Sequence, residues 1–135
     1  MQKLSKETFE RCDDPSCTDR PKGKITHTGI SLPPDRAEIG RASWRFLHTI
    51  AARYPQKPDE SQQNRMEKWV RAFTHLYPCH ICRLGFEEII ASHPPRLDCR
   101  ENFSLWMCEA HNLVSEEIGG KIVPCDPKWL IDNYS

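Results

Sequence analysis

Apolar side chains recur at intervals of three and four residues from Asp35 towards the end of the chain. This spacing places them on one face of an α-helix. The first predicted helix begins at Asp35, an N-cap residue with Glu38 in position to complete a capping box, and ends at Pro55. Its apolar face consists of Phe46, Leu47, Ile50, Ala51 and Tyr54.

Three further helices are predicted over residues 59–77, 79–92 and 100–118, and Gly119-Gly120 ends the last of them. Their apolar faces are formed by Met66, Trp69, Val70, Phe73, Leu76 and Tyr77, then by Cys82, Phe86, Ile89, Ile90 and His93, and finally by Phe103, Trp106, Met107, Ala110, Leu113, Val114 and Ile118. A last turn of helix is predicted at residues 129–130. No segment alternates as a β-strand does, so the chain is predicted to be all-α, a four-helix bundle with a short fifth helix.

Residues 1–34 carry only scattered large apolar side chains without a period. They are predicted to form a flexible N-terminal arm, whereas residues 35–135 form a single helical domain. Only 38% of the residues are hydrophobic, which is low for a globular chain. We therefore expect a cross-link, a bound cofactor or a second subunit to stabilise the core.

The charges balance, with 19 Lys and Arg against 19 Asp and Glu. A main partner that is nucleic acid or an anionic membrane surface requires an excess of basic residues, so neither is predicted. No apolar run reaches the roughly 18 to 20 residues that span a bilayer. The first ten residues also lack the apolar segment of a secretory signal peptide.

Seven cysteines without a secretion signal indicate metal binding, thiol redox chemistry or an oxidising compartment reached by another route. The pair Cys79-His80-Ile81-Cys82 lies at the predicted start of a helix, where unpaired amides and the helix dipole favour a thiolate. Half of a zinc site is the alternative, but a zinc site usually brings a second such pair. Redox chemistry on a helical scaffold is therefore favoured over a non-enzymatic zinc-binding helical module. An inert, cysteine-linked adaptor is a third interpretation.

The remaining cysteines have different predicted roles. A disulfide between Cys108 and Cys125 would stabilise the domain by about 3 kcal/mol in the chain-entropy model, the alternative being two free thiols. Cys12 and Cys17 in the arm form either a tethered dithiol that reaches a fixed site or an exposed pair with no catalytic task. Cys99 is predicted to be a free thiol, with an intersubunit bridge as the minor alternative.

Two predicted helices carry polar stripes beside their apolar faces. One consists of Arg41, Trp44 and His48, and the other of Cys108, His111, Asn112 and Ser115. If the stripes face one another, they form a slot that suits a flat heteroaromatic cofactor, and Trp129 could close it. The alternative is that they are ordinary residues on the flanks of helices.

The segments 40–49, 77–82 and 106–114, followed by Cys125 and Trp129, resemble the Erv/ALR family of FAD-linked sulfhydryl oxidases. The resemblance implies a four-helix bundle with a short fifth helix that binds FAD non-covalently and forms a homodimer. It implies that Cys79 is the interchange thiol and Cys82 the flavin-proximal thiol, with Cys108–Cys125 as a structural disulfide. The implied cofactor contacts are Gly40, Arg41, Trp44, His48, Tyr77, Cys108, His111, Asn112, Ser115, Lys128 and Trp129, and no metal ligands are implied.

The implied activity is the formation of disulfides in protein substrates. A dithiol protein or a disulfide-relay oxidoreductase would reduce Cys12–Cys17, and these would reduce Cys79–Cys82 by thiol–disulfide exchange. FAD would then pass the electrons to oxygen, giving hydrogen peroxide, or to cytochrome c. The implied location is the mitochondrial intermembrane space, or the cytosol if the protein is viral. The sequence departs from the family at Ser115, where the family commonly has Asn.

Overall fold

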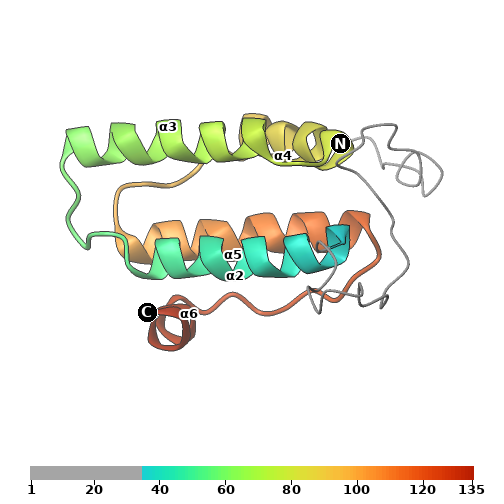
Figure 1. Cartoon of the computed structure of the whole chain (residues 1–135). Coiled ribbons are helices and arrows are strands. Elements are labelled where there is room, and N and C mark those ends of the chain that lie inside the picture. The colour runs from blue at the N-terminus through green and yellow to red at the C-terminus, as the bar shows by residue number, and fades with distance from the viewer. Residues whose placement is uncertain (1–34) are drawn as a thin grey trace, which may run out of the picture.

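The computed structural model describes residues 35–135, and Cys12, Cys17 and the rest of the predicted arm lie outside this part. Within residues 35–135 the chain contains helices and no strand, which confirms the all-α prediction. The helices are α2 (Arg36–Ala52), α3 (Glu60–Leu76), α4 (His80–Ser92), α5 (Arg100–Glu117) and α6 (Pro127–Tyr134) (Figure 1). The predicted boundary between arm and domain stays a prediction.

Side-chain caps explain where several helices begin. Asp35 accepts the backbone N–H of Glu38 at 2.9 Å. Among the described residues, however, no side-chain bond from Glu38 returns to Asp35, so the predicted capping box is only half formed. A complete box lies at the start of α3, where Asp59 Oδ1 accepts the Gln62 N–H at 2.7 Å and Gln62 Oε1 accepts the Asp59 N–H at 2.9 Å. Gln62 therefore makes both hydrogen bonds of the capping box, whereas Glu38 makes only the one from its backbone N–H.

The helices form two layers (Figure 1). α3 and α4 pack against each other in one layer, and α2 and α5 pack along each other in the second. α6 packs against both α2 and α5 on the side away from α3, with its axis across theirs. The beginnings of α2 and α4 and the ends of α3 and α5 therefore meet at one end of the bundle, on the right in Figure 1.

The core lies between these layers and is centred on α5. Phe103, Trp106 and Met107 are at most 2% exposed and contact apolar side chains of the other helices. Two buried polar groups find backbone partners, since Tyr54 Oη donates to Leu97 O at 2.8 Å and Trp106 Nε1 donates to His93 O at 2.9 Å. These bonds remove the cost of burying the polar ends of large aromatic side chains.

Four residues placed on predicted apolar faces are exposed instead: Phe46 (50%), Leu76 (76%), Ile118 (60%) and His93. His93 is the C-cap residue of α4 and lies beyond its last turn. Phe46 lies beside Leu47, which occupies the core-facing position of α2, so its ring contacts only the edge of Trp69. Leu76 is the last residue of α3 and Ile118 is the C-cap of α5. Both are exposed because the ends of these helices extend beyond the neighbouring side chains that would cover them. Of the described helices, none has an apolar stretch long enough to cross a bilayer.

Candidate active site

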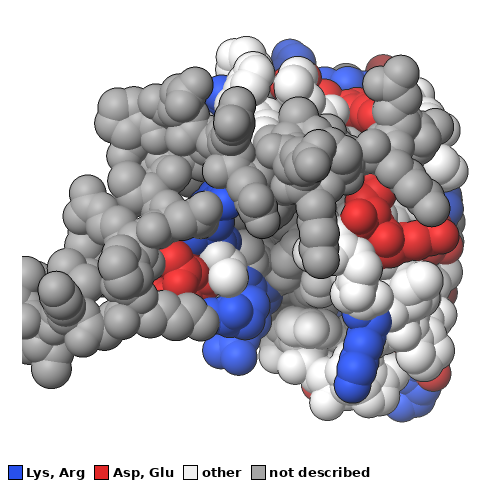
Figure 2. Space-filling view, turned by 90° about the vertical axis from the view of Figure 1, so that its right-hand side faces the viewer, with Lys and Arg blue, Asp and Glu red and all other residues white. Residues whose placement is uncertain are grey.

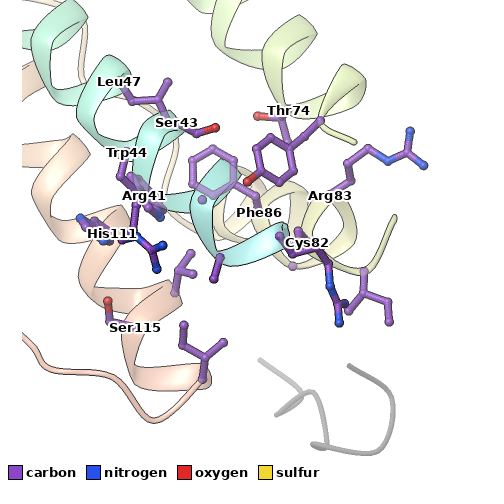
Figure 3. Close-up of a pocket in the computed structure, with 18 of the residues that line it drawn as sticks. Arg41, Ser43, Trp44, Leu47, Thr74, Cys82, Arg83, Phe86, His111 and Ser115 are labelled. Atoms are coloured by element: carbon purple, nitrogen blue, oxygen red, sulfur yellow. The ribbon is translucent and has the colours of Figure 1, made fainter. Parts of the chain in front are cut away.

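A cavity of about 630 Å³ lies at the end of the bundle where the two layers meet (Figure 3). Its walls come from the first half of α2, the last turn of α3, the first turns of α4 and the last turns of α5. Its volume is within the range typical of cofactor sites. Among its lining residues are Gly40, Arg41, Ser43, Trp44, Phe73, Tyr77, Cys82, Arg83, Phe86, His111, Ser115 and Glu117.

One wall is a series of flat rings from α2 and α5. The indole of Trp44 stacks on the imidazole of His111, with ring centroids 4.1 Å apart and an interplanar angle of 10°. Behind this stack, Nε2 of His48 lies 3.0 Å from Nδ1 of His111. In Figure 3, Trp44, Arg41 and His111 lie on one side of the cavity, and Cys82 and Arg83 of α4 lie on the other. The two predicted polar stripes therefore do face a common space, through these residues.

Burial keeps both histidines neutral at pH 7. The pKa of His48 falls from 6.5 to about 4, because the ring is removed from water and lies beside His111. Burial also lowers the pKa of His111. The short contact between the two nitrogens needs one donor and one acceptor, so a single proton lies between the rings.

Tyr134, the last residue of α6, supports the wall from the side away from the cavity. No role for it was predicted from the sequence. Its ring stacks on His48 at 4.8 Å with an interplanar angle of 23°. Trp129, the predicted closing residue, is instead 55% exposed, does not line this cavity and meets Tyr134 edge-on at 6.3 Å. The aromatic character of Tyr134 is visible in the sequence, but α6 is too short to show which of its faces is buried.

The redox pair lies at the start of α4. Cys79 and Cys82 are joined by a disulfide with their Cα atoms 5.2 Å apart, and Cys79 is the N-cap residue of the helix. Cys82 lines the cavity, whereas the side chain of Cys79 is only 3% exposed. In the described structure no side chain caps α4, so its first amides and the positive end of its dipole are available to a thiolate formed on reduction.

The rest of the lining combines two aromatic rings with an open backbone position on α2. Phe86 presents itself edge-on to Trp44 at 5.8 Å. Burial raises the pKa of Tyr77, which is hydrogen-bonded to Ser43, so the phenol stays protonated. A methyl group built on Gly40 would lie 3.9 Å from Tyr77 Oη, which leaves room for a ligand to approach the backbone of α2 there.

Other predicted contacts of the cofactor lie outside the cavity lining. Asn112 donates to Val123 O at 2.7 Å and accepts the Val123 N–H at 3.0 Å, so its amide holds the connection between α5 and α6. Cys108 and Cys125 form the expected disulfide, with Cα atoms 5.8 Å apart. Lys128 pairs with Asp132 at 2.8 Å on α6. Asn112 and the Cys108–Cys125 disulfide therefore hold the chain that leads into α6, whereas the Lys128–Asp132 pair lies within that helix.

Arg83 connects the redox loop to α3. Its guanidinium donates to His75 O at 3.2 Å and lies 3.3 Å from Nδ1 of His80, one of the two residues between the cysteines. In the part of the chain that the structure describes, no group of three or more His, Cys, Asp or Glu side chains is arranged to hold a metal ion. Cys99 is a free thiol that accepts the Asn102 N–H at the start of α5.

Comparison with known proteins adds independent information. The model of the Erv1 / Alr family matches residues 41–135. A mitochondrial FAD-linked sulfhydryl oxidase, ERV1 of Saccharomyces cerevisiae, is 42% identical over 86 residues, which are 64% of this chain and 46% of that protein. The FAD-linked sulfhydryl oxidase ERV1 of Arabidopsis thaliana is 38% identical over 100 residues, covering 72% of this chain and 52% of its own.

The fold matches as well. The crystal structure of the FAD binding domain of Erv1 from Saccharomyces cerevisiae aligns with a TM-score of 0.71 and 35% identity, covering 76% of this chain and all of that one. The chain spans about half the length of the curated relatives named above. The family model covers most of the described helices, most of the cavity lining and both disulfides, and the chain belongs to the Erv1/Alr family.

Proposed function

We propose that this chain is a thiol oxidase that uses FAD, held in the cavity, to form disulfides in protein substrates. The observation that carries the proposal is the placement of Cys82. It belongs to a redox-capable CxxC disulfide and at the same time lines a cavity with aromatic walls. The relatives named as FAD-linked sulfhydryl oxidases support the same chemistry.

The residues present fit a flavin nucleotide. Trp44, His111 and Phe86 offer flat apolar surface to a planar ring system, as cofactor sites commonly do. Gly40 leaves room for close approach to α2, and Arg41 places a cation at the same wall for a phosphate group. When bound, FAD would accept the electron pair of the reduced cysteines and deliver it to oxygen or to cytochrome c.

The thiol chemistry follows from the start of α4. A substrate thiolate attacks Cys79 Sγ, which breaks the Cys79–Cys82 bond and leaves a mixed disulfide and the Cys82 thiolate. The second substrate thiolate then displaces Cys79, so the substrate gains a disulfide and the pair Cys79/Cys82 holds two more electrons. Free amides of the first helical turn stabilise the thiolate at Cys82. Because Cys79 is 3% exposed, attack requires its sulfur to become more accessible first.

The first experiment is a visible absorption spectrum of the purified protein, followed by oxygen consumption with dithiothreitol. We expect a bound flavin and turnover that Cys82→Ser abolishes. Cys99→Ser, which removes the described free thiol at the start of α5, is the matched control and should retain turnover. Colourless protein that carries zinc released by a chelator would instead support the zinc-binding module, and normal turnover in Cys82→Ser would refute the assignment of that thiol.

The arm, the partners and the location are parts of the same proposal. Cys12 and Cys17 act as a shuttle between a dithiol protein, or a disulfide-relay oxidoreductase, and Cys79–Cys82. The double variant Cys12→Ser/Cys17→Ser should slow turnover of a protein substrate and leave dithiothreitol turnover unchanged; equal slowing of both would contradict the shuttle. The protein acts as a homodimer in the mitochondrial intermembrane space; relatives named as mitochondrial support the organelle alone. Sedimentation and cell fractionation test these two points.

A further inference from the structure

Four rings form a continuous series from the cavity to the last helix. Trp44 lies at the cavity and stacks on His111. His111 is hydrogen-bonded to His48, and His48 in turn stacks on Tyr134. The series joins α2 to α5 and α6, two helices that lie far from α2 along the chain.

We propose that Tyr134 is a positioning residue for the cofactor cavity. Its ring holds the imidazole of His48 in one orientation, and the hydrogen bond from His48 then keeps His111 stacked on Trp44. The step from this geometry to cofactor binding rests on the proposed function, since it assumes that the cavity holds FAD. The positioning itself does not depend on any bound cofactor.

The orientation of His48 matters because its hydrogen bond is directional. Nε2 meets His111 Nδ1 at 3.0 Å, and rotation of either ring about its Cβ–Cγ bond would break this contact. His48 is 6% exposed, so water cannot readily replace a lost partner. A flat ring at 4.8 Å and 23° covers one face of the imidazole and opposes that rotation.

Trp129 cannot perform this task, although it lies on the same helix. It is 55% exposed and contacts Tyr134 only edge-on. Tyr134 is held in place by the packing of α6, whose Leu130 is 4% exposed, and by the Cys108–Cys125 disulfide at the entry to that helix. The C-terminal helix is thereby a structural part of the cofactor site without lining the cavity.

The test compares three variants. Tyr134→Phe keeps the stacked ring, Tyr134→Leu removes it with little change in apolar character, and Trp129→Leu is the matched control on α6. The first readout is the imidazole nitrogen NMR spectrum of flavin-free protein, titrated with pH. Wild type, Tyr134→Phe and Trp129→Leu should show His48 in one tautomer with a lowered pKa, and Tyr134→Leu should show tautomer averaging and a pKa closer to 6.5.

The second readout is the dissociation constant of FAD, from fluorescence quenching on adding FAD to flavin-free protein. Loss of an aromatic contact should weaken binding about three- to tenfold in Tyr134→Leu and leave Tyr134→Phe within about twofold of wild type. An unchanged His48 spectrum in Tyr134→Leu, or an equal change in Trp129→Leu, would overturn the proposal. Failure of every form to bind FAD would refute the proposed function, and the His48 spectrum would still decide the role of Tyr134.

Discussion

His111 in the cavity wall and His48 behind it meet through a single N–H, and this makes the wall sensitive to acid. His48 and His111 are both neutral at pH 7 because burial lowers the pKa of each. Protonation of both rings would place two N–H groups against each other and break the contact. The integrity of the wall therefore depends on pH, through residues that are not redox-active.

The flavin-free protein should accordingly lose stability as the pH falls. In the unfolded chain His48 has a pKa near 6.5, whereas in the folded chain its pKa is about 4. Between these values only the unfolded chain takes up the proton, so the free energy of unfolding falls as the pH is lowered from 6.5 to 4, by roughly 3 kcal/mol in total. Urea unfolding at several pH values measures this. The variant His48→Gln should flatten the dependence, and the same slope in wild type and variant would contradict the assignment.

Gly40 is the residue at which close approach of a cofactor can be tested separately from the fold. Apart from its own helix, the nearest described atom to a methyl group there is Tyr77 Oη, at 3.9 Å. Gly40→Ala should therefore stabilise flavin-free protein by about 0.5–1 kcal/mol, because alanine favours a helix, while it weakens FAD binding. Thermal unfolding with and without FAD measures both. Unweakened binding would show that the cofactor does not approach this backbone.

At the scale of the element, the start of α4 determines how readily the cysteine pair is reduced. Arg83 holds this turn to the end of α3 and places a positive charge beside the redox loop. A nearby cation stabilises a thiolate and therefore the reduced pair. The charge and the hydrogen bonds of Arg83 are separate contributions, and different substitutions remove them.

We expect Arg83→Leu to make the reduction potential of Cys79–Cys82 more negative by roughly 5–20 mV, the effect of one exposed charge interaction. Equilibration with glutathione redox buffers, followed by thiol trapping, measures the potential. Arg83→Lys keeps the charge but loses the forked contact with His75 and His80. A potential unchanged in Arg83→Leu, or equally shifted in both variants, would show that the charge is not the cause.

α6 depends on a cross-link in addition to its packing. Replacing Cys108 and Cys125 together by alanine should lower the free energy of unfolding by about 3 kcal/mol and weaken FAD binding, because α6 loses its anchor. Reduction of Cys79–Cys82 by dithiothreitol should stay normal. Denaturant unfolding and thiol trapping measure the two effects. The control Cys99→Ala removes only a weak N-cap and should cost about 1 kcal/mol or less.

At the scale of the whole molecule, the cavity lies between two layers and close to one end of each. A ligand there would contact both layers at once. In hydrogen-exchange mass spectrometry, FAD should therefore protect the first turns of α2 and α4 and the last turns of α3 and α5 more than the opposite ends of the same helices. Uniform protection along the helices would show that the ligand acts on global stability alone.

Charges of both signs are visible at this end of the molecule. In Figure 2, which faces it, the described side chains that can be seen include basic and acidic groups close to one another.

Helix types and most of their bounds could be predicted from the sequence, because apolar spacing and proline positions act locally. The Cys108–Cys125 pairing was also accessible, since Gly119-Gly120 lets the chain turn back. The place of Tyr134 behind His48 was not, because it depends on how α6 lies across α2 and α5. The orientation of α6 is set by contacts between segments that are distant in the sequence, and the local spacing of apolar residues does not reveal such contacts.

The division into two layers has a consequence for how the protein responds to the supply of riboflavin. If bound flavin connects the two layers at the cavity end of the bundle, then the supply of riboflavin, from which flavin is made, affects the lifetime of each protein molecule. Cells starved of riboflavin would contain more of the empty form, which opens more often and is degraded sooner. The abundance of the protein would then fall with the supply of riboflavin even while its messenger RNA stayed constant.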